Sequence, residues 1–256
     1  MDRDLKTGLV SVIIPTFNAE RYIIDTITSV LHQDYEEFEI LLADDASTDS
    51  TVSICESFIA RDSRIRLLAS KVNSGAAEAR NRALQAARGQ YVAFLDADDM
   101  WRSDKLSQQL NFMREKECSF SFTAYRVCKW DGAFTGKIVD LKSPERVGYR
   151  DMLAKRATLG CSTVMIDQSV VGRLRMPLIR TGQDYALWLS ILREGRRACR
   201  LPMALTDYRI VPGSISRNKR LKAQRQWKIY RELEGLRLDQ SALYFGQYVY
   251  HAFFRN

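Results

Sequence analysis

The chain has 256 residues, of which 46% are hydrophobic, and its formal net charge is +8 at pH 7. This length suits one large domain with a buried core, or one domain with a small appendage. The five cysteines are scattered without a CxxC pair and only two histidines are present, which disfavours both a disulfide framework and a zinc site.

Strand and helix patterns alternate over the first hundred residues. Short apolar runs predict buried strands at 10–14, 38–43, 64–69 and 91–95. Apolar residues at helical spacing follow each of the first three runs, and Asn18 is placed to cap the first of these helices. Because the strands are apolar throughout, we expect a parallel sheet that is covered by helices on both faces.

Polar residues cluster directly after three of the four predicted strands. PTFN follows the first strand, DDASTD the second and DADD the fourth. In a parallel sheet the ligand binds outside the carboxyl ends of the strands, so we expect the site at this edge. No GxGxxG follows the first strand and no GxxxxGK[ST] occurs, which disfavours a dinucleotide-binding Rossmann domain or a P-loop enzyme.

The DADD cluster places Asp96, Asp98 and Asp99 at the tip of a buried strand. Like charges this close repel one another unless a proton or a cation lies between them. Mg²⁺ is typically held by one or two carboxylates together with substrate phosphates. The cluster therefore indicates either a metal site or a surface turn in which Asp99 caps the following helix.

The pattern changes after about residue 115. Shorter strand-like pieces, SFSFTAYRV, FTGKIV and STVMI, are mixed with loops. DYALWLSILREG predicts an amphipathic helix over 184–195, in which Asp184 stands at the N-cap. From residue 217 onward the sequence predicts further helices.

The segments VSVIIPTFN, LLADDASTDST, NSGAAEARNRAL and ARGQYVAFLDADDMW resemble the family 2 glycosyltransferases of the GT-A fold in order and spacing. The similarity continues through GQDYALWLSILREG and YRIVPGSISRNK, and covers residues 10 to about 220. It implies an α/β fold: a Rossmann-like αβα sandwich with a mixed, mainly parallel sheet, plus C-terminal helices. The resemblance divides the chain into a catalytic domain at 1–216 and a basic, aromatic helical tail at 217–256. Within the domain it implies a nucleotide-binding half (10–100) and an acceptor-binding half (101–216).

The resemblance places the donor nucleotide at the carboxyl edge of the sheet. In this family a segment after the first strand lines the nucleotide pocket, and it matches Pro15, Thr16, Phe17 and Asn18. The acid that matches Asp45 hydrogen-bonds the uracil ring, with a turn role as the alternative. The segment around Arg80 lies near the nucleotide, with a salt bridge on its helix as the alternative.

The DxD element of the family matches Asp96 and Asp98. Its last acid ligates a divalent cation that bridges the donor diphosphate, so Asp98 is the expected ligand of Mn²⁺ or Mg²⁺. Asp96 is either a second ligand or a contact to the ribose or to a water on the metal. Asp184 matches the acid that serves as the catalytic base.

Two further residues are candidates for substrate contacts. Trp188 lies four residues after Asp184 on the same helical face, where it would form the floor of the acceptor site or pack in the core. Arg217 flanks VPGSIS, which the sequence predicts to be a mobile loop. Some relatives use a basic residue near here, so Arg217 is a weak candidate for binding phosphate.

The implied reaction is an inverting transfer of a hexose or N-acetylhexosamine from a UDP-sugar to a hydroxyl of a glycan. Charge grows on the leaving diphosphate, where a cation stabilises it, and the acceptor hydroxyl needs a base. No Ser–His or Cys–His arrangement is evident, which is consistent with direct displacement. The tail resembles that of bacterial members that build surface polysaccharides such as O-antigen, which implies an acceptor linked to polyprenyl diphosphate.

The tail carries most of the net positive charge, with eight basic residues and two acids between Arg217 and Arg237. Aromatic and basic residues together suit a helix on an anionic membrane, and packing on the domain or on a second subunit is the alternative. The N-terminal MDRDLKTG lacks the apolar segment of a secretion signal. We expect a cytoplasmic protein, peripheral on the inner face of the membrane, with its oligomeric state open.

Three other classes of protein compete with this interpretation. A nucleotidyltransferase would share the core and the paired carboxylates, but it needs a Gly- and Arg/Lys-rich loop where this chain has PTFNAE. A nucleic-acid-binding module is suggested by charge alone and has no motif in its favour, so we expect no nucleic-acid partner. A noncatalytic nucleotide-sugar binder is the last alternative, although every expected acidic group is present.

Overall fold

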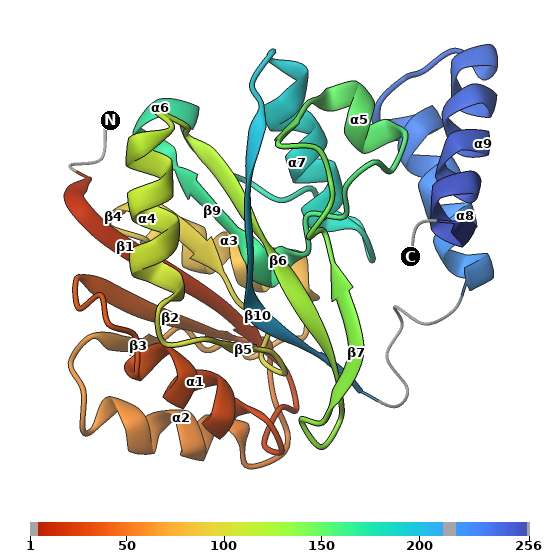
Figure 1. The fold of residues 1–256 in the computed structure, drawn as a ribbon. Coiled ribbons are helices and arrows are strands. Elements are labelled where there is room, and N and C mark those ends of the chain that lie inside the picture. The colour runs from red at the N-terminus through yellow and green to blue at the C-terminus, as the bar shows by residue number, and fades with distance from the viewer. Residues whose placement is uncertain (1–4, 212–218, 255–256) are drawn as a thin grey trace.

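The computed structural model describes residues 5–211 and 219–254, and its first half alternates strands and helices as predicted (Figure 1). The elements of this half are β1 (Lys6–Thr16), α1 (Ile23–Leu31), β2 (Phe38–Asp44), α2 (Thr51–Ile59), β3 (Ile65–Leu67), α3 (Ala76–Ala86) and β4 (Gly89–Phe94). The elements that follow are β5 (Met100–Trp101), α4 (Lys105–Glu115), β6 (Phe120–Lys129), β7 (Phe134–Val139), β8 (Arg146–Val147), α5 (Tyr149–Leu153), β9 (Val164–Asp167), α6 (Gln168–Val171), α7 (Gln183–Arg193) and β10 (Ala198–Ile210).

One ten-stranded sheet runs through the molecule in the order β3-β2-β1-β4-β9-β6-β10-β5, with β7 paired to β6 and β8 to β10. β1 pairs in parallel with β2 and β4, and β6 pairs in parallel with β10. β9 runs antiparallel between β4 and β6. The sheet is therefore mixed and mainly parallel, which confirms the expected α/β fold.

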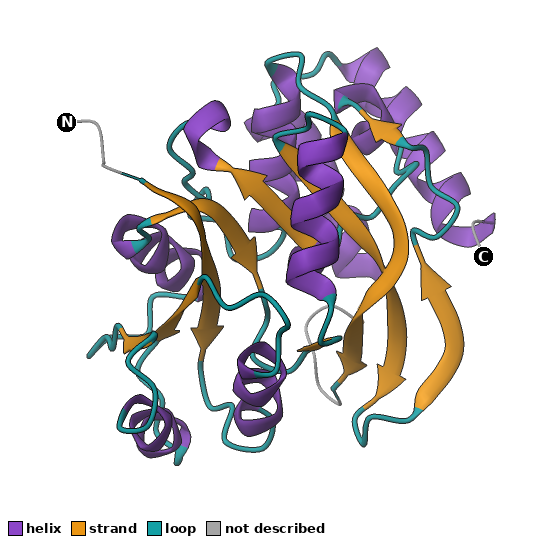
Figure 2. Ribbon diagram, turned by 60° about the vertical axis from the view of Figure 1, so that its left-hand side comes forward, coloured by secondary structure: helices purple, strands orange, loops and turns teal. Residues whose placement is uncertain are grey.

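Helices cover both faces of the sheet (Figure 2). Along β1, Val12 and Ile14 pack into one core while Ile13, between them, packs into the other. The first core receives apolar side chains from α1, α2 and α4, and the second from α3, α5 and α7. Burial on both sides explains why the strand sequences are apolar throughout rather than alternating.

The loop between β1 and α1 corrects one prediction. α1 begins at Ile23, so Asn18 is not its N-cap. Asn18 instead adopts a positive φ of 47°, and its side-chain carbonyl accepts a hydrogen bond of 2.8 Å from the Thr48 backbone N–H. Asn is among the few non-glycine residues that tolerate this conformation, so here it joins the loops after β1 and β2.

The C-terminal segment packs on the rest of the molecule beside α5 and α7 (blue in Figure 1). It consists of α8 (Lys219–Lys228), a π-helical turn (Ile229–Leu233) and α9 (Leu238–Phe254). Tyr230 is fully buried and its hydroxyl donates to the carbonyl of Leu153 at the end of α5. Glu234 accepts hydrogen bonds from Tyr149 and Arg193. Of the alternatives for the tail, packing on the domain is thus confirmed.

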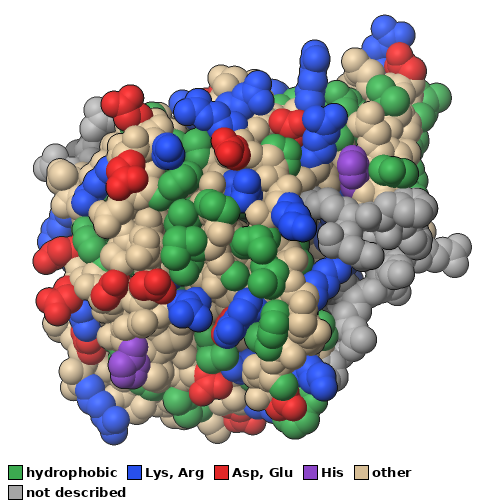
Figure 3. Space-filling model, in the orientation of Figure 1, with side chains coloured by type: hydrophobic (Ala, Val, Ile, Leu, Met, Phe, Trp, Pro, Cys, Tyr) green, Lys and Arg blue, Asp and Glu red, His purple; other side chains and the backbone are tan. Residues whose placement is uncertain are grey.

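The surface carries charges of both signs. On the face seen in Figure 3, Lys and Arg side chains lie beside Asp and Glu, with apolar side chains between them. Within the described ranges, no helix is long and apolar enough to cross a bilayer. Contact of the tail with a membrane surface stays a prediction.

Candidate active site

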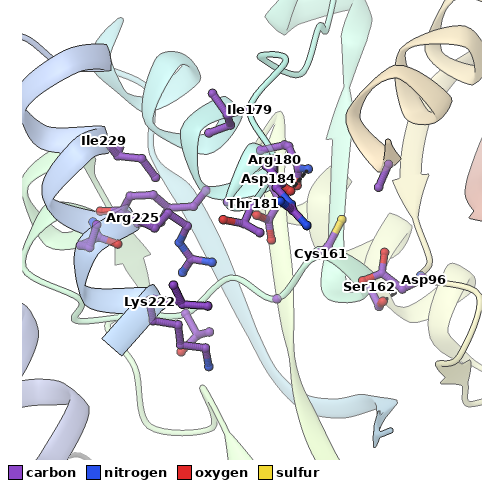
Figure 4. A pocket seen from close by; sticks show the side chains of 18 of the residues that line it. Asp96, Cys161, Ser162, Ile179, Arg180, Thr181, Asp184, Lys222, Arg225 and Ile229 are labelled. Carbon is purple, nitrogen blue, oxygen red and sulfur yellow. Dashed lines mark hydrogen bonds between the residues drawn. The ribbon is translucent and has the colours of Figure 1, made fainter. Parts of the chain in front are cut away.

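A cavity of about 1610 Å³ opens at the carboxyl end of β4 and extends to the C-terminal helices (Figure 4). Its walls come from the acidic loop after β4, from segments around 157–163 and 179–185, and from α8. In Figure 4, Asp96 lies at one end, Lys222 and Arg225 lie at the other, and Asp184 lies between them. The fold therefore assembles one space from parts of the chain that are far apart in the sequence.

Arg80 holds the first carboxylate of the acidic loop. It projects from α3, and its Nη2 lies 2.5 Å from Asp96 Oδ1. The Arg80 side chain is 8% exposed and that of Asp96 is 31% exposed, so the pair is largely shielded from solvent. Both residues line the cavity. Arg80 thus forms a salt bridge, although its partner lies in the loop after β4 rather than on its own helix. Contact of Arg80 with a nucleotide stays a prediction.

Asp99 anchors the acidic loop instead of capping a helix. It is followed by β5, and α4 begins only at Lys105, so the predicted helix cap is wrong. Its carboxylate accepts hydrogen bonds from the Ser162 hydroxyl at 2.5 Å and from the Arg209 backbone N–H at 2.9 Å. Asp99 thereby ties the loop to β10 and to the turn before β9.

Ser162 is a site residue that the sequence did not reveal. Its hydroxyl donates to Asp99 and accepts a hydrogen bond of 3.0 Å from the Asp96 backbone N–H. Its carbonyl accepts a hydrogen bond of 2.7 Å from the Trp101 indole N–H. A serine in front of a short strand carries no signal of its own, because its role depends on contacts more than 60 residues away along the chain.

Two carboxylates of the acidic loop, Asp98 and Asp99, are harder to ionise than a free aspartate. Burial and the neighbouring Asp96 raise the pKa of Asp98 to about 6, although Arg209 and Arg80 oppose this shift. Burial and the charges of Asp98 and Asp96 also raise the pKa of Asp99 well above its usual range. A cation in contact with Asp98 would relieve both the repulsion and the loss of solvation.

The acidic loop fits a cation that is shared with phosphate. The described residues contain no group of three or more His, Cys, Asp or Glu side chains that would hold a metal ion unaided. Asp98 and Asp96 both line the cavity and supply hard oxygen donors. Mg²⁺ commonly takes only one or two carboxylates when substrate phosphates complete its shell, so two carboxylates suffice here.

The PTFN segment is brought to the cavity only in part. Phe17 is 50% exposed and lines it. Thr16 is buried and its hydroxyl donates to Asp44, while Pro15 continues the pairing of β1 with β2. Asn18 holds the loop as described above. Nucleotide contact by this segment stays a prediction, and Phe17 is the side chain best placed to make it.

Asp45 supports the loop in front of α3. Its two carboxylate oxygens accept hydrogen bonds from the backbone N–H groups of Ser74 at 3.0 Å and Gly75 at 2.7 Å. Arg82 lies 3.8 Å away, and Asp45 is only 2% exposed. A carboxylate retains further lone pairs after two such bonds, so contact with a uracil ring stays a prediction.

Asp184 points into the middle of the cavity. It is the second residue of α7, whose N-cap position is Gly182 at φ 80°, so the predicted N-cap role is wrong. Burial opposes the charge of Arg80, but Cys161, Asp96 and Asp184 together raise the pKa of that guanidinium above its usual value. Asp184 therefore lies close enough to the acidic end of the cavity to act on Arg80. Its role as the catalytic base stays a prediction.

Trp188 belongs to the core rather than to the cavity. It has no exposed surface, and its indole N–H donates to the Leu159 carbonyl at 3.1 Å. Its ring lies 5.4 Å from those of Phe94 and Phe120, measured between centroids. The predicted acceptor contact is therefore wrong, because the helical face that carries Trp188 is buried one turn beyond Asp184.

The tail supplies a wall of the cavity that no motif indicated. Lys222, Arg225 and Ile229 line it from α8 and the turn that follows. Arg217, the weak candidate for phosphate binding, lies outside the described residues. The tail is thus part of the site as well as of the core.

Comparison with known proteins identifies the family. The model described as "Glycosyl transferase family 2" matches residues 11–174. The chain is 46% identical over 244 residues to the putative teichuronic acid biosynthesis glycosyltransferase TuaG of Bacillus subtilis, covering 95% of this chain and 96% of that protein. It is 38% identical over 222 residues to the UDP-Glc:alpha-D-GlcNAc-diphosphoundecaprenol beta-1,3-glucosyltransferase WfgD of Escherichia coli, covering 86% of this chain and 85% of that protein.

A solved structure shows the same architecture. TarS 1–349 of S. aureus in complex with UDP-GlcNAc aligns with a TM-score of 0.75 at 21% identity, covering 96% of this chain and 73% of that chain. This likeness shows the GT-A fold, with the mixed sheet and the C-terminal helices described above. Fold, family model and full-length relatives agree, and the chain belongs to glycosyltransferase family 2.

Proposed function

We propose that this glycosyltransferase moves a hexose or N-acetylhexosamine from a UDP-sugar to a hydroxyl of a polyprenyl-diphosphate-linked glycan in surface polysaccharide synthesis. The observation that carries the proposal is the single cavity into which Asp96, Asp98 and Asp184 all project. The activity named for WfgD supports the UDP-sugar donor and the acceptor class, and the name of TuaG supports surface polysaccharide. Such an acceptor would bring the enzyme to the inner face of the cytoplasmic membrane.

The donor diphosphate belongs at the acidic end of the cavity. Asp98, with Asp96 beside it, would hold Mn²⁺ or Mg²⁺ there. A bound divalent cation neutralises the negative charge that grows on the leaving diphosphate. Arg80 adds a second positive charge and fixes Asp96, while Asp99 and Ser162 hold the loop in place. These contacts preorganise the site before the donor arrives.

The acceptor hydroxyl belongs beside Asp184. This carboxylate would take the proton of the hydroxyl as its oxygen attacks the anomeric carbon. Attack from the side opposite the diphosphate breaks the sugar–phosphate bond in one step and inverts the anomeric centre. Cys161 also lines the cavity, but burial raises the pKa of its thiol well above the usual range, so it stays protonated and is a poor nucleophile.

The two remaining alternatives explain less of the geometry. A noncatalytic binder of nucleotide sugars has no need for a carboxylate such as Asp184 at the centre of the cavity. A nucleotidyltransferase would attack a phosphate rather than a sugar carbon. It would release pyrophosphate from a nucleoside triphosphate, or sugar 1-phosphate from a UDP-sugar, instead of UDP. The identity of the released product therefore distinguishes these classes of protein.

A transfer assay tests the proposal. Purified protein would be incubated with Mn²⁺, a panel of UDP-sugars and GlcNAc-diphosphate on a short lipid, with UDP release and product mass as readouts. We expect one UDP-sugar to give a product of inverted anomeric configuration by NMR. Release of sugar 1-phosphate instead of UDP, retention of configuration, or no UDP release with any sugar would contradict the proposal.

The same assay, run with variants, tests whether Asp184 is the catalytic base. Asp184→Asn is expected to lower kcat by about 10²–10⁴-fold while UDP affinity stays unchanged, because the base acts only in the chemical step. Asp239→Asn changes an exposed acid in the first turn of α9 and is the matched control. Wild-type turnover by Asp184→Asn would remove Asp184 from the mechanism.

A further inference from the structure

The end of the cavity opposite the acidic loop is basic. Lys222 and Arg225 project into it from α8, while Arg180, in front of α7, lies beside Asp184 (Figure 4). The two α8 residues are three positions apart, so they share one face of the helix. Within the ranges that the structure covers, none of these three cations lies within 4.0 Å of a carboxylate oxygen.

Lys222 lies close enough to Arg225 to feel its charge, and packing holds Arg225. Desolvation and then the charge of Arg225 lower the pKa of Lys222. A Cβ atom built on Gly182 would lie 3.0 Å from Arg225 Cδ and 3.2 Å from Ile229 Cδ1, so the stem of Arg225 is packed against the start of α7. Two cations this close repel each other unless an anion lies between them.

Apolar side chains adjoin the two cations. Ile179, Ile229 and Tyr248 line the same part of the cavity. Leu221 and Leu233 also line it and are 52% and 40% exposed, so an apolar path leads from the cations toward the surface. A ligand that matches this wall has a compact anionic group and an apolar chain.

We propose that Lys222 and Arg225 bind the diphosphate of the lipid-linked acceptor, whose lipid chain leaves over Leu221 and Leu233. This inference rests on the proposed function and adds a second diphosphate site to it. The donor diphosphate lies at the acidic end with its cation, and the acceptor diphosphate lies at the basic end without one. Asp184, between the two ends, then meets the sugar hydroxyl that the acceptor presents.

A binding experiment tests the site with the donor position filled. Full-length protein saturated with UDP and Mn²⁺ would be titrated calorimetrically with farnesyl diphosphate below its micelle concentration. Each of Lys222→Gln and Arg225→Gln is expected to weaken this binding by about tenfold or more, because each removes a charge-assisted hydrogen bond. Lys222→Arg keeps the charge and is expected to bind within about threefold of wild type.

Two controls accompany this experiment. One tests whether any loss of tail charge weakens binding, and the other tests whether the site needs the lipid chain as well as the diphosphate. Arg237→Gln changes a basic tail residue that is 81% exposed and outside the cavity, and it is expected to bind like wild type. Inorganic pyrophosphate is expected to bind at least about tenfold more weakly than farnesyl diphosphate, since it lacks the apolar chain. Equal affinity for the two probes would overturn the assignment to a lipid-linked group.

UDP affinity separates this inference from the proposed function. UDP with Mn²⁺ is expected to bind Lys222→Gln and Arg225→Gln as it binds wild type. A loss of UDP affinity in these variants would assign the two cations to the donor and overturn the inference. If UDP binds wild type but farnesyl diphosphate does not, the second site is wrong and the proposed function stands. If UDP itself fails to bind wild type, the proposed function fails.

Discussion

Arg80 and Asp96 form a shielded ion pair, Nη2 to Oδ1 2.5 Å, across 16 residues of sequence. Arg80 comes from α3, the helix before β4, and Asp96 comes from the loop after β4. The ion pair therefore links this helix to the loop at the carboxyl end of the strand. The guanidinium offsets the repulsion between Asp96 and Asp98 and leaves Asp98 free to face the cavity. The pair thus connects the stability of the loop to the chemistry of the site.

A double-mutant cycle tests this pair. Arg80→Met is expected to lower the free energy of unfolding by about 2 kcal/mol, because it leaves Asp96 unpaired beside Asp98. Asp96→Asn added to it should restore part of the loss, with a coupling energy of about 1 kcal/mol from urea titrations. The exposed pair Arg237–Asp239 is the control and should couple by less than about 0.5 kcal/mol. Additive effects at Arg80 and Asp96 would contradict the account.

Ser162→Ala is expected to loosen the acidic loop. The change removes the donor to Asp99 and the acceptor of the Asp96 N–H, both within a buried environment. We predict a loss of about 1–3 kcal/mol in unfolding free energy, together with weaker Mn²⁺-dependent UDP binding. Ser190→Ala removes an exposed hydroxyl on α7 and should leave both quantities unchanged. Unchanged UDP binding in Ser162→Ala would mean that the loop is held by other contacts.

Trp188→Phe is expected to affect stability and not acceptor use. The indole N–H and part of the ring are lost, and the Leu159 carbonyl is left without its donor. Unfolding free energy should fall by about 1–3 kcal/mol, while KM for the acceptor stays within twofold of wild type, about the error of such comparisons. A large rise in acceptor KM in a variant of near-native stability would return Trp188 to the acceptor site.

Lys105 supplies a test of pH dependence. It has no exposed surface, its Nζ lies 3.8 Å from the centroid of the Trp101 ring, and this nitrogen has no hydrogen-bond partner among the described residues. Burial lowers the pKa of Lys105 well below its usual range. In the unfolded chain Lys105 keeps its proton up to about pH 10.4, whereas in the folded chain it loses the proton at a lower pH. Because the unfolded chain binds more protons between these two pKa values, wild-type stability rises with pH in that range.

Lys105→Met removes this penalty. The variant is expected to be more stable than wild type, with the largest gain at the acidic end of that window and a shrinking gain toward pH 10. Denaturant titrations at pH 6 and pH 9 would measure both differences. Lys116→Met, at an exposed position after α4, is the control and should show no such trend. A destabilised Lys105→Met would show instead that the contact with Trp101 outweighs the cost of burial.

The first half of the fold could be predicted because its signals are local. Three of the four predicted runs are strands buried on both faces, while β3 is only partly buried, and each polar cluster marks the edge where the strands end. β10 was missed because its thirteen residues include charges that break the apolar pattern. The structure satisfies one of them across the sheet, where Arg126 and Asp207 pair at 2.5 Å between β6 and β10.

The site could be predicted only where its residues lie in one motif. Asp96, Asp98 and Asp184 belong to recognisable segments, and all three line the cavity. Ser162 acts through Asp99, which is 63 residues away, and α8 reaches the cavity only by packing on α7. Helical spacing placed Trp188 on the face of Asp184, but spacing does not say where the core ends along that face.

The proposed mechanism depends on a divalent cation that Asp98 holds and that contacts the diphosphate of UDP. Calorimetric titration of wild type and Asp98→Ala with UDP, with and without Mn²⁺, tests it most directly. We predict that Mn²⁺ strengthens UDP binding to wild type and that this metal-dependent part disappears in Asp98→Ala, with Asp104→Ala as the control. Equal UDP affinity with and without Mn²⁺ in wild type, or an undiminished metal effect in Asp98→Ala, would contradict the account.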